Sequence, residues 1–205
     1  MEIFKNITFE NIRLSLLAGI MIGVAGFANL MVGGIAGAVL FSFGLLSVCI
    51  TGLHLFTGKA GIFELRKLSG WTYIIMVLVC NVIGTVIAAA MCMPGASDEA
   101  LIRLHAILVN RENAYLTTTL LRAIMCGFIM EFAVHMHRNG SQFGIIYGVP
   151  LFILCGFYHS IADSFYYSAW MYLGGETLPY CLLYLSTILG NLIGCNLRRL
   201  FAWQW

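Results

Sequence analysis

Long apolar runs are the feature that most limits how this chain can fold. Six of them are separated by shorter polar stretches, and one bilayer span needs about 20 apolar residues. Their approximate bounds are 14–32, 34–62, 71–93, 116–136, 143–169 and 179–197. Only 10% of the 205 residues are charged, which is too few to cover a soluble surface. We therefore expect an all-α integral membrane protein with six transmembrane helices in a single transmembrane domain over residues 1–205.

The remaining composition excludes several classes of protein. A net charge of +2 is too small to indicate a nucleic-acid partner. The seven cysteines contain no Cys-x-x-Cys pair, so we interpret them as small buried hydrophobic residues and not as a metal site or disulfide framework. There is no phosphate-binding loop, so we expect no use of ATP. We expect no cofactor and no signal peptide, because the first apolar run is too long for a signal-peptide core.

The charged residues between the spans predict how the chain is oriented. Six spans put both termini on one side, together with Lys5, Arg13, Arg66, Lys67, Arg138, Arg198 and Arg199. The opposite side holds Arg103 and Arg111 beside three acidic residues. The positive-inside rule then places both termini in the cytoplasm of a multi-pass plasma (inner) membrane protein. Trp71, Trp203 and Trp205 are expected at the lipid–water interface.

The two halves of the sequence resemble each other. Residues 80–84 read Cys-Asn-Val-Ile-Gly and residues 190–194 read Gly-Asn-Leu-Ile-Gly. The second and fifth spans are both too long for a simple helix. We predict two inverted three-helix repeats, at about 11–93 and 116–200, joined by an outer loop at about 94–115. Chance or helix packing is the alternative explanation for the paired Asn-x-x-Gly sites.

Polar residues interrupt the two over-long spans at matching places. Gly52 precedes His54 and Thr57, and Gly156 precedes His159 and Ser160. Broken helices at matching places in inverted repeats indicate a substrate path near the middle of the membrane. We expect Asn81 and Asn191 to lie beside this path and to satisfy the backbone groups that the breaks set free.

His159 is the first candidate for a functional residue. An ionisable group at membrane depth is costly, so its presence favours a functional role. The alternative is a neutral imidazole that is satisfied by a neighbouring carbonyl group.

Two motifs carry a resemblance to a known family. Residues 41–46, Phe-Ser-Phe-Gly-Leu-Leu, through residues 52–58, Gly-Leu-His-Leu-Phe-Thr-Gly, resemble the second span of the formate/nitrite transporter family. Residues 156–162, Gly-Phe-Tyr-His-Ser-Ile-Ala, resemble its fifth-span signature, Gly-Phe-Glu-His-Ser-hydrophobic-Ala. The resemblance covers nearly the whole chain. It implies an aquaporin-like protomer with its own pore, in a homopentamer embedded in lipid.

The resemblance also implies roles for particular residues. His159 would be the central histidine, Thr57 its hydrogen-bond partner, and Arg111 would stand where the family has a lysine at the outer mouth. A solvated loop position is the alternative for Arg111. The apolar constrictions would be Phe41, Leu45, Leu55, Phe56 and Phe152.

Four departures from the family pattern alter the charge near the expected pore. His54 stands in place of an acidic residue, Tyr158 in place of the signature glutamate, and Lys59 in place of a neutral residue. Asp163 replaces an asparagine. One helical turn beyond His159, it is expected to pair with a cation, either His159 or Lys59. His54 is expected to cap the break or to form a second titrating site.

These features predict a transport protein and not an enzyme. We expect a passive or proton-coupled channel for small monovalent weak-acid anions, with formate first and nitrite and hydrosulfide open. Arg111 would attract the anion, and a proton supplied at or near His159 would let it cross as neutral acid, since imidazole ordinarily titrates near pH 6.5. Two alternatives are a channel for a neutral or cationic solute such as ammonia, supported only by Asp163, and a membrane haem protein with His54 and His159 as axial ligands.

Overall fold

The computed structural model describes residues 7–201, and every regular element in that range is a helix. This confirms the predicted all-α class. The elements are α1 (Phe9–Val32), α2 (Gly34–Ile50), α3 (Phe56–Ala60), α4 (Leu68–Cys92), η1 (Met93–Gly95), α5 (Asp98–Glu112), α6 (Leu116–Arg138), α7 (Phe143–Leu154), α8 (Ser160–Tyr172), η2 (Leu178–Tyr180) and α9 (Cys181–Phe201). Lys5, Trp203 and Trp205 lie outside the described residues.

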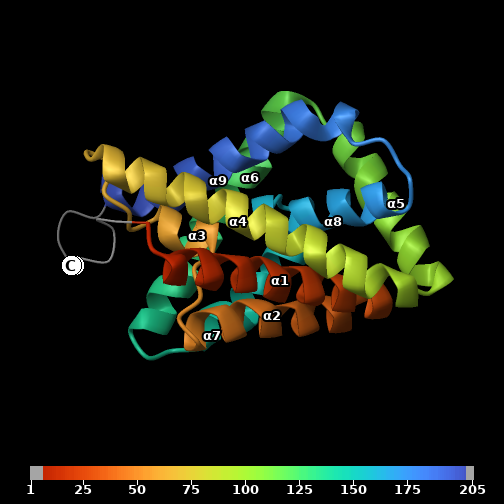
Figure 1. Ribbon diagram of the computed structural model, residues 1–205, viewed down its shortest axis with the longest axis horizontal. Helices are drawn as coiled ribbons and strands as arrows, with labels where there is room; N and C mark the ends of the chain where they lie inside the picture. Colours follow the sequence, from red (N-terminus) through yellow and green to blue (C-terminus); the bar gives the residue numbers. More distant parts are fainter. Residues whose placement is uncertain (1–6, 202–205) are drawn as a thin grey trace.

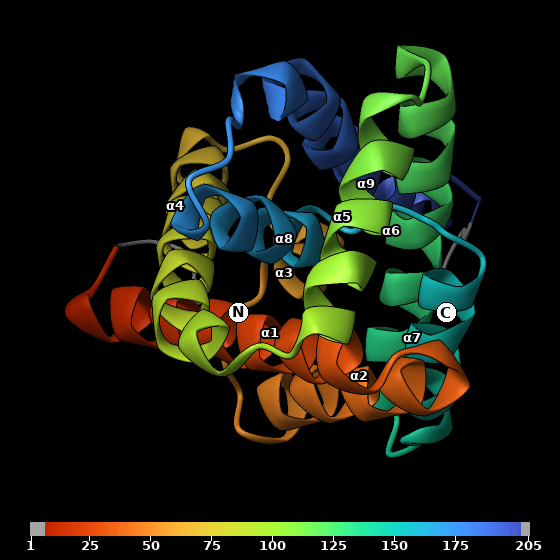
Figure 2. The same ribbon diagram turned by 90° about the vertical axis from the view of Figure 1, so that its right-hand side faces the viewer.

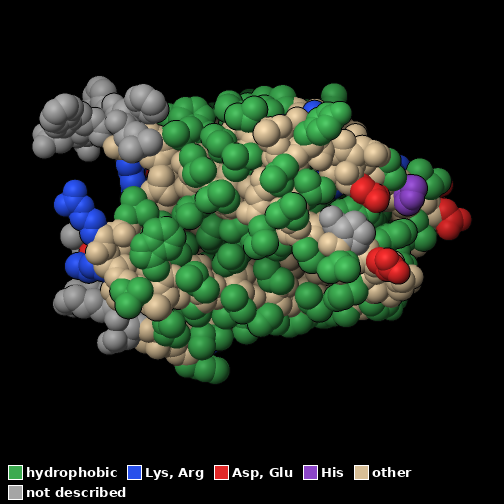
Figure 3. All heavy atoms as spheres, turned by 90° about the horizontal axis from the view of Figure 1, so that it is seen from above, with side chains coloured by type: hydrophobic (Ala, Val, Ile, Leu, Met, Phe, Trp, Pro, Cys, Tyr) green, Lys and Arg blue, Asp and Glu red, His purple; other side chains and the backbone are tan. Residues whose placement is uncertain are grey.

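The surface is that of a multi-pass membrane protein. Helices α1, α6 and α9, and the segment Leu68–Gly95 that contains α4, are long and apolar enough to cross a membrane, while α2 and α7 are shorter apolar helices. Large apolar side chains such as Ile75 and Leu185 are more than half exposed. In Figure 3 apolar side chains cover the middle of the molecule, basic ones gather at one end, and acidic ones gather at the other.

The second and fifth apolar segments are broken where the sequence predicts. Helix α2 ends at Ile50 and α3 begins at Phe56, while α7 ends at Leu154 and α8 begins at Ser160. At each break a glycine, Gly52 or Gly156, has a positive φ, of 72° and 66° respectively. Only glycine adopts this left-handed conformation without a steric penalty, so the two glycines permit the chain to leave the helical path.

The two halves of the chain have matching arrangements. Helix α1 packs against α4 as α6 packs against α9, and α4 contacts α8 as α9 contacts α3. The central helices α2 and α7 pack against each other. In Figure 1 α4 runs from left to right and α9 from right to left, and α1 begins at the end where α9 finishes. These contacts and directions match the packing expected of two inverted repeats.

The segment between the repeats is not the loop that its polarity predicts. Most of it forms α5, whose N-terminus is capped by the side chain of Ser97, which accepts a hydrogen bond from the amide of Ala100. Ala100, Leu104 and Leu108 recur every four residues and are buried on one face. Figure 2 shows α5 crossing the end of the molecule in front of α1 and α8, both of which it contacts. The polar outer face of this helix is the reason that the segment resembles a loop in sequence.

Candidate functional site

Asn81 organises the first break. Its side-chain oxygen accepts a hydrogen bond of 2.8 Å from the amide of Phe56, the first residue of α3. Its side-chain nitrogen donates to the carbonyl oxygens of Ser15, at 2.7 Å, and of His54, at 2.9 Å. One buried amide therefore satisfies backbone groups of α1, of the break and of the short helix. In the interior of a bilayer there is no water that could replace these hydrogen bonds, so the protein must supply them itself.

Asn191 does the same at the second break. Its oxygen accepts from the amide of Ser160, at 2.8 Å, and its nitrogen donates to the carbonyl oxygens of Ala123 and Tyr158, both at 2.8 Å. Both asparagines are fully buried. As predicted, their side chains form hydrogen bonds with backbone groups that the two breaks leave without helical partners.

His159 lies at the second break as the N-cap of α8. Its Nδ1 accepts a hydrogen bond of 3.2 Å from the amide of Ala162, and its Nε2 lies 3.1 Å from the Oγ1 of Thr57. A backbone N–H can only donate, so Nδ1 carries no proton and the ring is a neutral imidazole with its hydrogen on Nε2. The Nε2–H then donates to Thr57. The side chain of His159 is only 3% exposed.

Thr57 therefore joins the two breaks. It lies in α3, and its hydroxyl group reaches the N-cap residue of α8. The expected hydrogen bond between Thr57 and His159 is present. Thr57 does not cap α3, because Leu55 is the N-cap and no side chain makes a capping bond there.

Two cavities flank this pair: His159 borders one, and Leu55 and Gly58, near Thr57 in the sequence, border the other. We call the cavity toward α5 the outer cavity and the one toward the ends of α2 and α6 the inner cavity. The outer cavity, of about 170 Å³, is bordered by His159 and Phe152 together with residues of α1, α5 and α8. The inner cavity, of about 330 Å³, is bordered by Leu45 and Leu55 together with residues near the ends of α2 and α6. The inner cavity thus borders the first break and the outer cavity the second.

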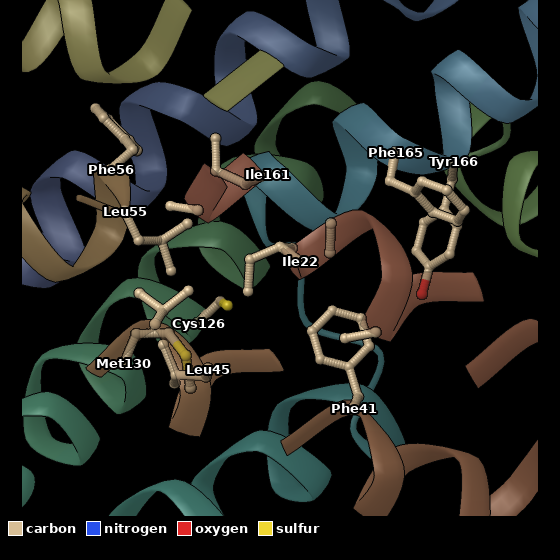
Figure 4. Packing of buried hydrophobic residues seen from close by; sticks show 14 of the residues in the cluster. Ile22, Phe41, Leu45, Leu55, Phe56, Cys126, Met130, Ile161, Phe165 and Tyr166 are labelled. Carbon is tan, nitrogen blue, oxygen red and sulfur yellow. The ribbon is translucent and has the colours of Figure 1, made fainter. Parts of the chain in front are cut away.

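The residues expected to form constrictions are all buried, but they do not all face the cavities. Phe152 stacks on the ring of His159, with centroids 5.5 Å apart, and Phe41 packs edge-on against Phe152 at 5.9 Å. In Figure 4 Leu55 points toward Leu45, whereas the side chain of Phe56 points away from it. Neither Phe41 nor Phe56 borders a cavity. The structure thus places Leu45 and Leu55 at the inner cavity and Phe152 at the outer one, with Phe41 packed against Phe152.

Asp163 pairs with Arg111, and the expectation that its cation would be His159 or Lys59 is wrong. The guanidinium Nη2 of Arg111 donates to Asp163 at 2.9 Å, and Nε donates to both carboxylate oxygens, at 3.2 and 3.3 Å. The side chains are 12% and 1% exposed, so this ion pair is largely withdrawn from solvent. Arg111 lies in α5 and not in a solvated loop, because the buried face of α5 carries it over the start of α8.

Tyr158 is a member of this cluster that sequence reasoning missed. The guanidinium of Arg111 lies 3.7 Å from the centre of the Tyr158 ring, close enough for a cation–π contact. Arg122 donates to the Tyr158 hydroxyl oxygen at 3.2 Å. The only sequence signal was that a tyrosine stands where the family signature has a glutamate. Nothing in the spacing of residues 111, 122 and 158 indicates that they meet.

The two other departures lie in different surroundings. The Nδ1 of His54 shares a hydrogen bond of 3.0 Å with the hydroxyl group of Tyr73, and His54 borders neither cavity. It neither caps α3 with its side chain nor faces the path. Lys59, in contrast, borders the inner cavity together with Arg138.

The fold and this site define a membrane transport protein in which two broken helices meet at a buried histidine between two cavities. A family model described as formate/nitrite transporter matches residues 5–203, and the chain belongs to that family. Its members are transporters and channels, not enzymes.

Individual relatives agree with this assignment. A probable formate transporter of Methanothermobacter thermautotrophicus is 27% identical over 231 aligned positions, which cover 89% of this chain and 83% of the relative. Among solved structures, a pentameric formate channel with formate bound has a TM-score of 0.75 at 22% identity, covering 91% of this chain and 92% of that one. An FNT family ion channel also has a TM-score of 0.75, at 18% identity, with 92% and 86% covered. These two likenesses establish the fold.

The site also bears on the two alternative functions. Both ring nitrogens of His159 are engaged by Ala162 and Thr57, so an iron ligand would have to displace one of these bonds. Asp163, the one feature that favoured a cation path, is neutralised by Arg111.

Proposed function

We propose that this protein is a passive or proton-coupled channel for a small monovalent weak-acid anion, with formate as the first substrate. The observation that supports it most directly is the neutral His159, hydrogen-bonded to Thr57, between two cavities and against the ring of Phe152. Family membership and the formate-binding title of a solved neighbour favour the same substrate class. Nitrite and hydrosulfide share its single charge and weak acidity.

The chemistry follows from the apolar neighbours of His159. An anion that leaves water for a site beside Phe41 and Phe152 loses several kcal/mol of hydration, to order of magnitude. Taking up a proton removes most of this cost. The Nε2–H of His159 and the hydroxyl of Thr57 are the donors that an anion at this point meets. A neutral imidazole that lost its Nε2 proton would become an imidazolate, so Nδ1 must take up a proton before or as Nε2 releases one. The bond from Ala162 must open transiently for this to happen.

We further propose that all six apolar segments cross the bilayer, that the basic end of the molecule is cytoplasmic, and that five copies assemble as in the pentameric neighbour. The first two proposals are supported by the paired breaks and by the charge separation in Figure 3. The exposed apolar faces of α4 and α9 are suitable for contact with lipid or with another copy.

The test is uptake of formate into proteoliposomes at a series of external pH values. For the wild-type protein, uptake should rise as pH falls, by up to about tenfold per pH unit, because the neutral acid increases in that proportion above its pKa. His159→Asn should flatten this profile, since an amide oxygen can still cap α8 but the side chain cannot relay a proton.

Two controls make the result decisive. Thermal unfolding of His159→Asn should be close to wild type, which separates a lost proton path from a lost fold. Methylammonium, tested beside formate, nitrite and hydrosulfide, should not be taken up. A wild-type pH profile in His159→Asn would rule out the histidine as the relay, and selective methylammonium flux would rule out the anion channel.

A further inference from the structure

The inner cavity carries positive charge that the mechanism above does not use. Lys59, His137 and Arg138 border it, and none of its bordering residues is acidic. Its volume, about 330 Å³, exceeds that of the outer cavity and is ample for a small hydrated anion. Lys59 lies in α3, two residues after Thr57, so this charge stands at the inner approach to the Thr57–His159 pair.

The acidic residues near this end are already engaged elsewhere. Glu131 pairs with Arg198 at 2.9 Å, and Glu64 pairs with Lys67 at 2.9 Å. Arg138 donates to the carbonyl oxygen of Gly58 at 2.8 Å, a bond that leaves its charge uncompensated. Within residues 7–201 neither Lys59 nor Arg138 forms an ion pair.

The outer cavity is different. Its bordering cation, Arg111, is bound by both oxygens of Asp163, so the charges of this pair sum to zero. Arg122 donates a hydrogen bond to the hydroxyl oxygen of Tyr158 and does not border the cavity. Among the Lys, Arg, Asp and Glu residues that border each cavity, the charges sum to +2 at the inner cavity (Lys59, Arg138) and to zero at the outer cavity (Arg111, Asp163).

From this difference we propose that the inner cavity is an anion-concentrating site formed by Lys59 and Arg138, and that it makes the pore asymmetric. A cavity bordered by one sign of charge raises the local concentration of the opposite ion. Outward flow of a small monovalent anion then saturates at a lower concentration than inward flow. The directional part of this proposal rests on the proposed function, whereas the binding site itself does not.

The site can be tested without transport. Lys59 in the purified, full-length protein is modified with an amine-reactive reagent, and the rate at this residue is measured by mass spectrometry in sodium formate and in sodium gluconate of equal ionic strength. Formate should slow modification of Lys59 several-fold, because the small anion enters the cavity and gluconate is too bulky. Modification of Lys67, which is paired with Glu64 outside the cavity, should be equal in the two salts. Equal rates at Lys59 would overturn the site.

The asymmetry is tested by initial uptake of radiolabelled formate into inside-out and right-side-out membrane vesicles. Inside-out vesicles, which present the Lys59 side to the medium, should show a half-saturating concentration several-fold lower. Lys59→Gln should raise that value toward the one from right-side-out vesicles, and Lys67→Gln should leave it unchanged. Equal values for the wild type, or an equal effect of both substitutions, would overturn the asymmetry. Absence of uptake from both preparations would count against the proposed function alone, because modification of Lys59 needs no flux.

Discussion

Asp163 illustrates how much of this site depends on single residues. The sequence predicts that it pairs with His159, one turn away, or with Lys59, but its carboxylate turns to Arg111 on a different helix. Tyr158 completes the cluster with the face of its ring. Where the family signature has a glutamate, this chain has Tyr158, and its acidic residue lies five positions later, at Asp163.

This arrangement makes a prediction about Asp163→Asn. The substitution keeps the shape of the side chain but leaves the guanidinium of Arg111 largely buried without a counter-charge. We expect a loss of about 3 kcal/mol in stability, the order found when one partner of a buried pair is removed. Thermal unfolding in detergent measures the loss, and formate uptake should saturate at a lower concentration on the Arg111 side.

The matched control is Asp98→Asn, which removes an exposed acid from the first turn of the same helix, α5. It should change stability by less than about 1 kcal/mol. The double variant Arg111→Gln with Asp163→Asn should recover part of the lost stability. A single variant as stable as wild type would show that the pair contributes little to folding.

At the scale of the element, the broken segments build the candidate site, since they bring Thr57 and His159 together. Each break is defined by a glycine with positive φ and by an asparagine from α4 or α9 that bonds to the freed backbone. The pseudo-symmetry extends to these hydrogen bonds but not to the residues at the centre. Leu55, directly before α3, corresponds to His159, directly before α8.

Gly156→Ala tests the geometry of the second break. Its φ is 66° and an added Cβ would meet no atom within 4 Å, so the only cost is the left-handed backbone, about 1–2 kcal/mol. We expect a lower unfolding temperature together with slower formate uptake, because the shift is passed to His159. Gly95→Ala is the control, since Gly95 has equal space and no positive φ. Equal effects of the two substitutions would contradict this account of the break.

At the scale of the whole molecule, the two ends carry opposite charge and the middle is apolar (Figure 3). Helix α1 begins and α9 finishes at the basic end (Figure 1). This separation supports the proposed orientation, with the basic end on the cytoplasmic side.

A labelling experiment on intact cells tests the orientation. Cysteine is placed at Asn113, after α5, or at Asn139, after α6, in a variant whose exposed native cysteines, Cys155 and Cys181, are replaced by alanine. A membrane-impermeant maleimide should label the Asn113→Cys protein in intact cells. It should label the Asn139→Cys protein only after the membrane is opened. The reverse pattern would invert the topology.

The sequence by itself determined the properties that are local or periodic. Apolar run length defined the helical membrane class, and the over-long spans with Gly52 and Gly156 predicted both breaks, because each signal is contained within one segment. The amphipathic face of α5 was also local, but its polar outer face made it resemble a loop. Only the tertiary structure decided how side chains meet across helices: Arg111 pairs with Asp163, the ring of Tyr158 lies beneath Arg111, and Phe56 points away from Leu45. Such contacts depend on the packing and rotation of separate helices, which no spacing along a single chain specifies.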